Sequence, residues 1–246
     1  MRCLLAIPAF HESQRLPKFL GELLAELDAA EQNCDVQVVD DGSGEEEQAR
    51  LQEISADLRR VHPRLLLPCL LPRNVGKGGA VREGLKQAGK YDWVGFVDAD
   101  GAVPAYEVCR LLDLAREPAS PGSALFASRI RMLGRYIERS ALRHLTGRAF
   151  ACLVGMQITP DIYDSQCGLK LLPAAAYQRV QPLLQENGFS FDVELLAALL
   201  AAGVRIEEVP IDWMDKAGSK VSLFRDTWRM FVAVRRINLR RKTWTL

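Results

Sequence analysis

The chain has 246 residues, a net charge of +1 and a hydrophobic content of 48%, which is enough for one large domain with a substantial core. No apolar run reaches the roughly 18 residues that would span a bilayer, and the N-terminal residues are interrupted too soon by Pro8 for a signal peptide. Six scattered cysteines without a Cys-x-x-Cys pair argue against zinc and disulfide frameworks, so we expect a cytoplasmic protein.

Apolar runs alternate with segments of helical periodicity over the first hundred residues. Strands are predicted at residues 4–9, 36–39, 65–71 and 93–97, and Pro68 suits an edge position for the third of them. Helices are predicted between these strands, at residues 16–27, 48–61 and 80–88. This order predicts the α/β class, with a doubly wound, mostly parallel sheet flanked by helices.

The pattern is looser in the second half of the chain. Helices are predicted at residues 108–115, 138–155 and 193–202, a loop at 118–122, and strands at 125–128 and 205–209. We find no internal repeat and no low-complexity linker in this part of the sequence.

The C-terminal residues differ in charge from the rest. Residues 216–246 hold nine Lys or Arg and one acidic residue, a net charge of +8, which leaves −7 for the preceding 215 residues. Between residues 221 and 239, apolar residues and arginines are interspersed as in a basic amphipathic helix. Such a helix either lies on an anionic bilayer surface or packs on the domain with its arginines in water. We therefore divide the chain into a domain of residues 1–221 and a basic segment of residues 222–246.

Two aspartates, Asp98 and Asp100, directly follow the predicted strand at 93–97. This position is the carboxyl end of a strand, where open α/β sheets bind ligands. Paired carboxylates there favour Mg²⁺ or Mn²⁺ held between the protein and a diphosphate. Surface turns produce the same short pattern, so other motifs in the chain are needed to distinguish a metal site from an ordinary turn.

Two other turns carry candidate binding residues. Asp40 and Asp41 end the strand at 36–39, and they either contact a ribose or a base or cap the helix that follows. The glycine-rich loop at 73–82 could approach phosphates through its backbone and the start of a helix. It lacks the Walker pattern, and Val81 replaces the third glycine of the dinucleotide fingerprint, which disfavours a P-loop ATPase and a simple dehydrogenase.

Several charged residues of the second half are candidates for anion binding. Six arginines lie between residues 129 and 148, and for most of them a solvated helix face is the better interpretation. Arg129 is the exception, because it directly follows a predicted strand and its guanidinium suits phosphate oxygens. Polar residues at 164–170 and 191–194 interrupt apolar stretches. Asp192 is predicted either to cap the helix at 193–202 or to position an acceptor or act as a base.

These motifs, in this order, resemble glycosyltransferase family 2, whose members have the GT-A fold. The resemblance is carried by Ile7-Pro8-Ala9-Phe10-His11-Glu12, Val38-Val39-Asp40-Asp41-Gly42-Ser43, the glycine-rich loop and Asp98-Ala99-Asp100-Gly101-Ala102. Residues 128–129, 164–170, 191–194, 208–213 and 218–220 are similar to the polyprenyl-phosphate sugar transferases, most of all the dolichyl-phosphate β-glucosyltransferases. Mannose-transferring relatives carry a glutamine where this chain has Ala102, which favours glucose over mannose.

The resemblance implies roles for the matching positions. The nucleotide-sugar donor would be bound by Pro8, Phe10, Glu12, Val39, Asp41, Lys77, Asp98, Ala99, Asp100, Arg129 and Lys220. Asp98 and Asp100 would meet the metal, with Asp100 as its direct ligand. Arg129 would hold phosphate, helped on the acceptor side by Arg139 or Arg143, and Lys220 would close over the donor.

The function implied is inverting, metal-dependent transfer of a hexose, with glucose favoured, from a nucleotide-diphosphate sugar to a polyprenyl phosphate. Because a phosphate monoester has a second pKa of about 6, the acceptor is already ionised at neutral pH and needs no strong base. If the acceptor were a sugar hydroxyl, Asp192 would be the base.

We expect UDP-glucose rather than GDP-mannose as the donor, Mg²⁺ or Mn²⁺ as the cofactor and no nucleic-acid partner. The basic C-terminal helix would bring the protein to the cytoplasmic face of a membrane. The alternatives are a family 2 glycosyltransferase with a saccharide or other soluble acceptor, and a non-catalytic nucleotide-sugar-binding protein.

Overall fold

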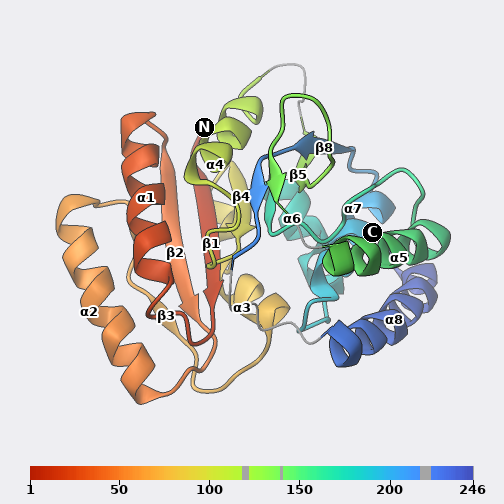
Figure 1. The fold of residues 1–246 in the computed structure, drawn as a ribbon, viewed down its shortest axis with the longest axis horizontal. Coiled ribbons are helices and arrows are strands. Elements are labelled where there is room, and N and C mark those ends of the chain that lie inside the picture. The colour runs from red at the N-terminus through yellow and green to blue at the C-terminus, as the bar shows by residue number, and fades with distance from the viewer. Residues whose placement is uncertain (118–121, 139–140, 217–222, 246) are drawn as a thin grey trace.

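The chain folds around a seven-stranded sheet with the order β3-β2-β1-β4-β7-β5-β8 (Figure 1). The computed structural model describes residues 1–117, 122–138, 141–216 and 223–245. Strand β7 runs antiparallel to both of its neighbours, and the other pairs are parallel. The predicted α/β class and mostly parallel sheet are confirmed. The strands are β1 (Cys3–Ala9), β2 (Cys34–Asp40), β3 (Cys69–Leu70), β4 (Trp93–Val97), β5 (Ala124–Ser128), β7 (Leu169–Pro173) and β8 (Ile206–Pro210).

Helices cover both faces of the sheet because successive strand residues point to opposite sides. On β1, Leu5 and Ile7 join a core with α1 (Leu16–Ala29), α2 (Glu45–Val61) and α4 (Ala105–Leu114). The alternate residues Leu4 and Ala6 join a second core on the other face. That core is built with α3 (Lys77–Gly84), α5 (Ala141–Gln157), α6 (Ala174–Val180), α7 (Phe191–Ala201) and α8 (Leu223–Arg240).

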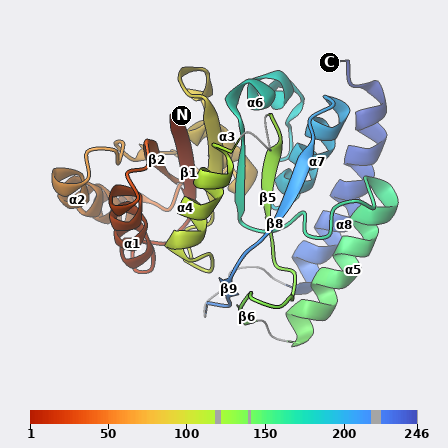
Figure 2. The same ribbon diagram turned by 90° about the horizontal axis from the view of Figure 1, so that it is seen from above.

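Helices α5 and α8 lie side by side at the end of the molecule opposite to α1 and α2 (Figures 1 and 2). Asn238 of α8 donates a hydrogen bond to Gln157 of α5 at 2.8 Å. Helix α7 lies between the sheet and this pair, and it is apolar almost all round because it is buried almost all round. Among the residues that the structure describes, no helix is both long and apolar enough to cross a bilayer.

The boundaries of several predicted elements need correction. The predicted strand at 65–71 is interrupted: Leu65 forms an isolated bridge with Val36, and Cys69–Leu70 form β3 at the sheet edge. Pro68 lies between these two pairings and cannot donate to the ladder. Helix α3 begins at Lys77 rather than at residue 80, and a short 3₁₀ helix, η1 (Ala88–Lys90), follows it. Strand β7 was not predicted, nor were α6 and the small β6 (Ile137–Glu138) and β9 (Trp213–Met214) pair.

Candidate active site

The two aspartates of the predicted metal site stand at the carboxyl end of β4, the middle strand of the sheet. The Asp98 side chain is 36% exposed, whereas Asp100 is largely enclosed and accepts a hydrogen bond from the Ala102 backbone N–H at 3.0 Å. Burial raises the pKa of Asp100, and the negative charge of Asp98 raises it further. Two carboxylates that repel each other form a site that favours a divalent cation.

The carboxylate oxygens present fit Mg²⁺ or Mn²⁺, but they are too few to enclose either ion. Within the described ranges, no group of three or more His, Cys, Asp or Glu side chains is arranged to hold a metal. A bound ion would therefore keep positions for water or for oxygens of a ligand, which is how Mg²⁺ is usually held beside phosphates.

Four side chains beside Asp100 form a network that we call the lysine–aspartate cluster: Lys77, Asp98, Lys170 and Asp192. The Lys77 ammonium lies 2.8 Å from Asp98 Oδ1 and 3.3 Å from Asp192 Oδ2. Lys170 Nζ donates to Asp192 Oδ1 at 2.5 Å and to the Cys167 carbonyl at 2.8 Å. These contacts bring together the starts of α3, α7 and β7 with the end of β4.

Three of the four charged side chains in this cluster are buried away from water. Lys170 and Asp192 are fully buried, and Lys77 is mostly buried, so only Asp98 faces solvent to a substantial degree. Burial alone would raise the pKa of Asp192, but Lys170 and Lys77 together lower it below the ordinary value. Asp192 is thus a charged counter-ion of two lysines. The capping alternative is wrong, because α7 begins at Phe191 and Ser190 takes the cap position.

Four backbone N–H groups of the glycine-rich loop, which the sequence suggested for phosphate, are instead bonded within the protein. The N–H groups of Val75 and Gly76 donate to the Asp41 carboxylate at 2.7 and 2.9 Å. Those of Gly78 and Gly79 donate to the Asn187 carbonyl at 2.7 and 3.2 Å. The glycines instead allow close packing: a Cβ on Gly78 would lie 2.4 Å from Phe191 Cβ.

The predicted nucleoside pocket lies at the carboxyl ends of β1 and β2, where Ala9 pairs with Asp40. Asp40 holds the following turn by accepting hydrogen bonds from the Ser43 N–H and from Gln48. Val39 is fully buried against α3, so its side chain packs in the core. Other members of the predicted pocket have various environments: Pro8 and Phe10 are partly exposed, Glu12 pairs with Arg15, and Ala99 is buried.

Arg129 follows β5 and is held by Asp164, which the sequence did not single out for a role. The guanidinium donates from Nε and Nη2 to the two oxygens of Asp164 at 2.7 and 2.8 Å, and it lies over the Trp213 ring. Burial alone would raise the pKa of Asp164, but Arg129 lowers it to about 2. Arg139 and Lys220 lie outside the described residues, and Arg143 belongs to α5 with its side chain not described.

Gly168 is a second residue of the site that sequence analysis missed. Its carbonyl accepts the Asp98 N–H at 2.9 Å, and a Cβ at this position would lie 2.2 Å from Asp98 Oδ2. Gly168 and Lys170 belong to the polar segment at 164–170 that the sequence analysis noted. Their contacts with Asp98 and Asp192 join positions far apart in the chain, so no local pattern indicated their roles.

The family model for glycosyl transferase family 2 matches residues 5–149, more than half of the chain. The chain belongs to glycosyltransferase family 2. This match and the relatives below confirm the resemblance found in the sequence, and they identify the protein as a glycosyltransferase.

Among curated relatives of this family 2 member is the dolichyl-phosphate beta-glucosyltransferase of Saccharomyces cerevisiae, 31% identical over 236 residues. That match covers 91% of this chain and 70% of the relative. The mouse protein of the same name is 33% identical over 89% of this chain and 69% of its own. Similar relatives from Dictyostelium discoideum and human bear that name as well.

Solved structures agree in fold at much lower identity. A glucosyl-3-phosphoglycerate synthase from Mycobacterium tuberculosis is 15% identical, with a TM-score of 0.67 over 98% of this chain and 80% of the other. A mannosyltransferase from Pyrobaculum calidifontis, in complex with GDP-Man and Mn²⁺, is 14% identical, with a TM-score of 0.59 over 100% and 76%. These likenesses confirm the predicted GT-A fold.

Proposed function

We propose that the protein transfers glucose from a nucleotide-diphosphate sugar, UDP-glucose by preference, to a polyprenyl phosphate. The observation that carries the proposal is the Asp98–Asp100 pair at the end of β4, with the Lys77 ammonium 2.8 Å from Asp98. Carboxylates for a divalent ion and a cation beside them are what a departing diphosphate requires. The names of the curated relatives support both glucose and a lipid phosphate as the substrates.

Asp100 and Asp98 would hold Mg²⁺ or Mn²⁺ in this proposal. The ion would supply positive charge that stabilises the nucleoside diphosphate as it leaves. Lys77 is charged at neutral pH, because Asp192 and Asp98 raise its pKa even though burial opposes this. Its ammonium is fixed between two carboxylates, so it needs no reorganisation to meet negative charge that develops near Asp98.

Asp192, the base that a sugar hydroxyl would need, is not suited to take a proton from the acceptor. Asp192 is fully buried and engaged by both lysines, and its lowered pKa makes it a weak base. A polyprenyl phosphate needs no base because it is ionised at neutral pH, whereas a sugar hydroxyl would need one. This favours the lipid phosphate over a saccharide acceptor. Direct attack by the phosphate would invert the anomeric centre and give a β-linked product.

Asp164 accepts hydrogen bonds from Nε and Nη2 of Arg129. We propose that the remaining guanidinium nitrogen, Nη1, contacts a phosphate. Arg139, Arg143 and Lys220 keep the roles that the resemblance implies, on the acceptor side and over the donor.

The outer face of α8 is proposed to rest on an anionic membrane surface. Val232 and Leu239 are exposed apolar residues on this helix, and Arg229 and Lys242 lie exposed near them in the sequence. The opposite face of the helix, with Val234 and Ile237, is buried in the core. A helix with one docked apolar face and one exposed basic and apolar face is suited to bind a bilayer surface while it stays attached to its domain.

Calorimetry with UDP-glucose and GDP-mannose, each with and without Mn²⁺, tests the donor assignment. We expect Mn²⁺-dependent binding of UDP-glucose that Asp100→Ala abolishes. Asp57→Ala on the surface of α2 is the matched control and should leave binding intact, because Asp57 is exposed and pairs with the exposed Arg60. Binding of neither sugar nucleotide would overturn the donor assignment. Transfer to a soluble saccharide, with none to polyprenyl phosphate, would overturn the acceptor assignment.

A further inference from the structure

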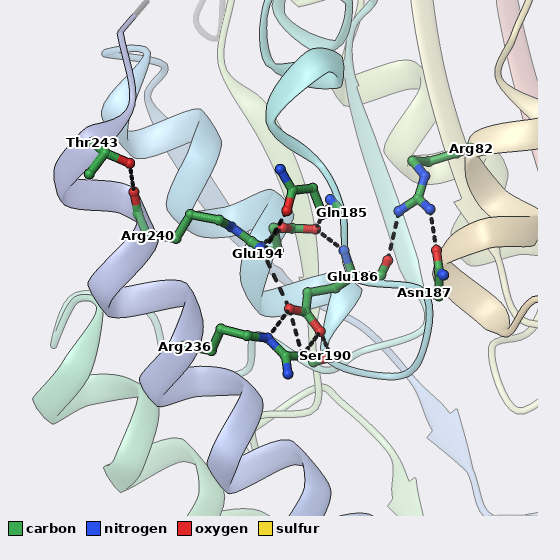
Figure 3. Close-up of polar contacts among 9 residues, drawn as sticks. All are labelled: Arg82, Gln185, Glu186, Asn187, Ser190, Glu194, Arg236, Arg240 and Thr243. Carbon is green, nitrogen blue, oxygen red and sulfur yellow. Dashed lines mark hydrogen bonds and ion pairs between the residues drawn. The ribbon is translucent and has the colours of Figure 1, made fainter.

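Residues 185–190, which lead into α7, lie between α3 and α8 (Figure 3). The segment and the start of α7 contain two buried glutamates, Glu186 and Glu194. With Arg236 and Arg240 of α8 they form a second network, which we call the arginine–glutamate cluster. Neither the sequence motifs nor the proposed chemistry accounts for it.

On the α8 side, arginines reach in to the two buried carboxylates. Arg236 donates from Nε and Nη2 to Glu186 at distances between 2.6 and 3.0 Å. Arg240 pairs with Glu194 and donates to the Gln185 side chain at 3.0 Å. The second oxygen of Glu194 accepts the N–H groups of Gln185 and Glu186 at 2.8 and 2.7 Å. The helix is therefore tied both to side chains and, through Glu194, to the backbone of the segment.

On the α3 side, the same segment is tied to the loop that carries Lys77. Arg82 of α3 donates to the Glu186 carbonyl at 2.7 Å and also to the Asn187 side chain. The Asn187 carbonyl accepts the N–H groups of Gly78 and Gly79, the two residues that follow Lys77. The two backbones pack tightly here, because a Cβ on Gly76 would lie 2.5 Å from the Asn187 carbonyl oxygen. A shift of the segment would therefore move the start of α3.

We propose that Glu186 is a positioning residue for the transfer reaction, and that it couples the docking of α8 to the placement of Lys77. Its carboxylate receives Arg236 from α8 while its carbonyl receives Arg82 from α3. Ser190, two residues before Asp192, also donates to the Glu186 carboxylate at 2.9 Å. The segment thus fixes Lys77 from one side and the start of α7, with Asp192, from the other. The inference rests on the proposed function only for the use that the reaction makes of Lys77.

The coupling has a physical basis in the burial of the two acids. Removing α8 would leave the carboxylates of Glu186 and Glu194 buried without their cations, which is strongly unfavourable. The segment would have to open toward water to solvate them, and Asn187 would move with it. Docking of α8 and closure of the segment on α3 are therefore two parts of one arrangement.

Hydrogen exchange of the full-length protein tests this coupling without any substrate. In Glu186→Gln and in Arg236→Gln, we expect the amides of residues 75–82 to exchange about fivefold faster, because local opening of the segment frees the Gly78 and Gly79 N–H groups. Arg236→Lys should restore much of the protection. Asn238→Ala is the matched control: it removes an α8 contact to α5 at Gln157 and should leave residues 75–82 unchanged.

Unchanged exchange at residues 75–82 in both Glu186→Gln and Arg236→Gln would overturn the proposal, and so would equal acceleration in Asn238→Ala. Kinetics with UDP-glucose give a second readout, since we expect the donor KM to rise about fivefold with little change in the acceptor KM. If wild-type protein does not use UDP-glucose, the proposed donor fails while the exchange result still decides the coupling.

Discussion

The lysine–aspartate cluster and the arginine–glutamate cluster lie on different sides of α7, and they are built for different tasks. Asp192 and Glu194 are two positions apart on the helix, so their side chains point in nearly opposite directions. Asp192 meets the sheet and Lys170, whereas Glu194 meets α8 and Arg240. One helix therefore supports the active site with one acid and anchors the C-terminal helix with the other.

The two clusters differ in their cations and in their access to ligand. In the first, compact lysine ammonium groups lie inside the protein and the partly exposed Asp98 faces outward. In the second, the acids are inside and the arginines reach them from the surface: Arg240 is 19% exposed and Arg236 56%. The first arrangement can receive a charged ligand at Asp98. In the arginine–glutamate cluster, the buried carboxylates are already paired with arginines of α8, so this cluster serves as a docking contact.

Breaking the docking contact at Arg240 should have the largest effect on stability. Arg240→Met leaves Glu194 buried without its cation, and we expect a loss of about 3–5 kcal/mol in the free energy of unfolding, measured by urea titration. Arg236→Met should cost about 1 kcal/mol or less, because Arg236 is largely exposed and its pair is screened by water. Equal losses for the two variants would contradict the distinction between them.

A substitution at Gly168 should affect the active site far more than the docking contact. The added methyl group of Gly168→Ala would lie 2.2 Å from Asp98 Oδ2 and must displace that carboxylate. We expect kcat/KM to fall about 10- to 100-fold, because a misplacement of the order of 1 Å is enough for such a loss. Activity is to be measured per folded molecule, with unfolding followed in parallel.

Gly188→Ala is the matched control for this substitution. It lies in the segment between α3 and α8, and a Cβ there meets nothing within 4 Å. We expect nearly unchanged activity and stability. If Gly188→Ala lowered kcat/KM as much as Gly168→Ala, the displacement of Asp98 would not be the cause.

The pair of Arg129 and Asp164 combines features of both clusters. The effects of Asp164→Asn on stability and on activity show which cluster the pair resembles. The pKa of Asp164 is about 2 in the folded protein, below its unfolded value of about 3.9, so its stabilisation is complete above pH 4 and is lost as the pH falls toward 2. We expect Asp164→Asn to cost about 2 kcal/mol near neutral pH and progressively less below pH 4.

Urea titrations of wild type and Asp164→Asn at several pH values between 3 and 7 measure this difference. A difference that stays constant with pH would show that the ion pair is not what Asp164 contributes. If Asp164→Asn lowers activity while leaving stability nearly intact, the pair belongs functionally with the lysine–aspartate cluster. A loss of stability with activity retained would place it with the docking contact.

The first half of the fold could be predicted because its information is local. Strands β1 and β4 are continuous apolar runs, β2 is rich in valine, and α1 and α2 repeat apolar residues at helical spacing. The acidic pair at 98 and 100 was found because it directly follows such a run. β7 was missed because the charged residue Lys170 interrupts its apolar run. Its burial depends on Asp192, 22 positions away in the chain.

The site was only partly predictable for the same reason. Asp98, Asp100 and Lys77 were named from motifs, but the partners that hold them come from α7 and from the segment before β7. For the glycine-rich loop, the sequence cannot reveal that Asn187 and Asp41 already accept four of its N–H groups. Glu186 belongs to no motif at all, and only the docked α8 shows why a buried acid is tolerated there.

The smallest effect should come from the outer face of α8, which neither cluster uses. We expect Val232→Ser combined with Leu239→Ser to weaken binding to vesicles of phosphatidylcholine and phosphatidylglycerol about fivefold, measured by co-sedimentation. Val61→Ser, an exposed apolar change at the end of α2, is the matched control and should not alter binding. Added salt should weaken wild-type binding further, since arginines and lysines contribute through screened electrostatics. Vesicle binding that is equally strong in all variants would contradict the proposal that the outer face of α8 binds the membrane. The role of the arginine–glutamate cluster would then be confined to holding the segment before α7 in place.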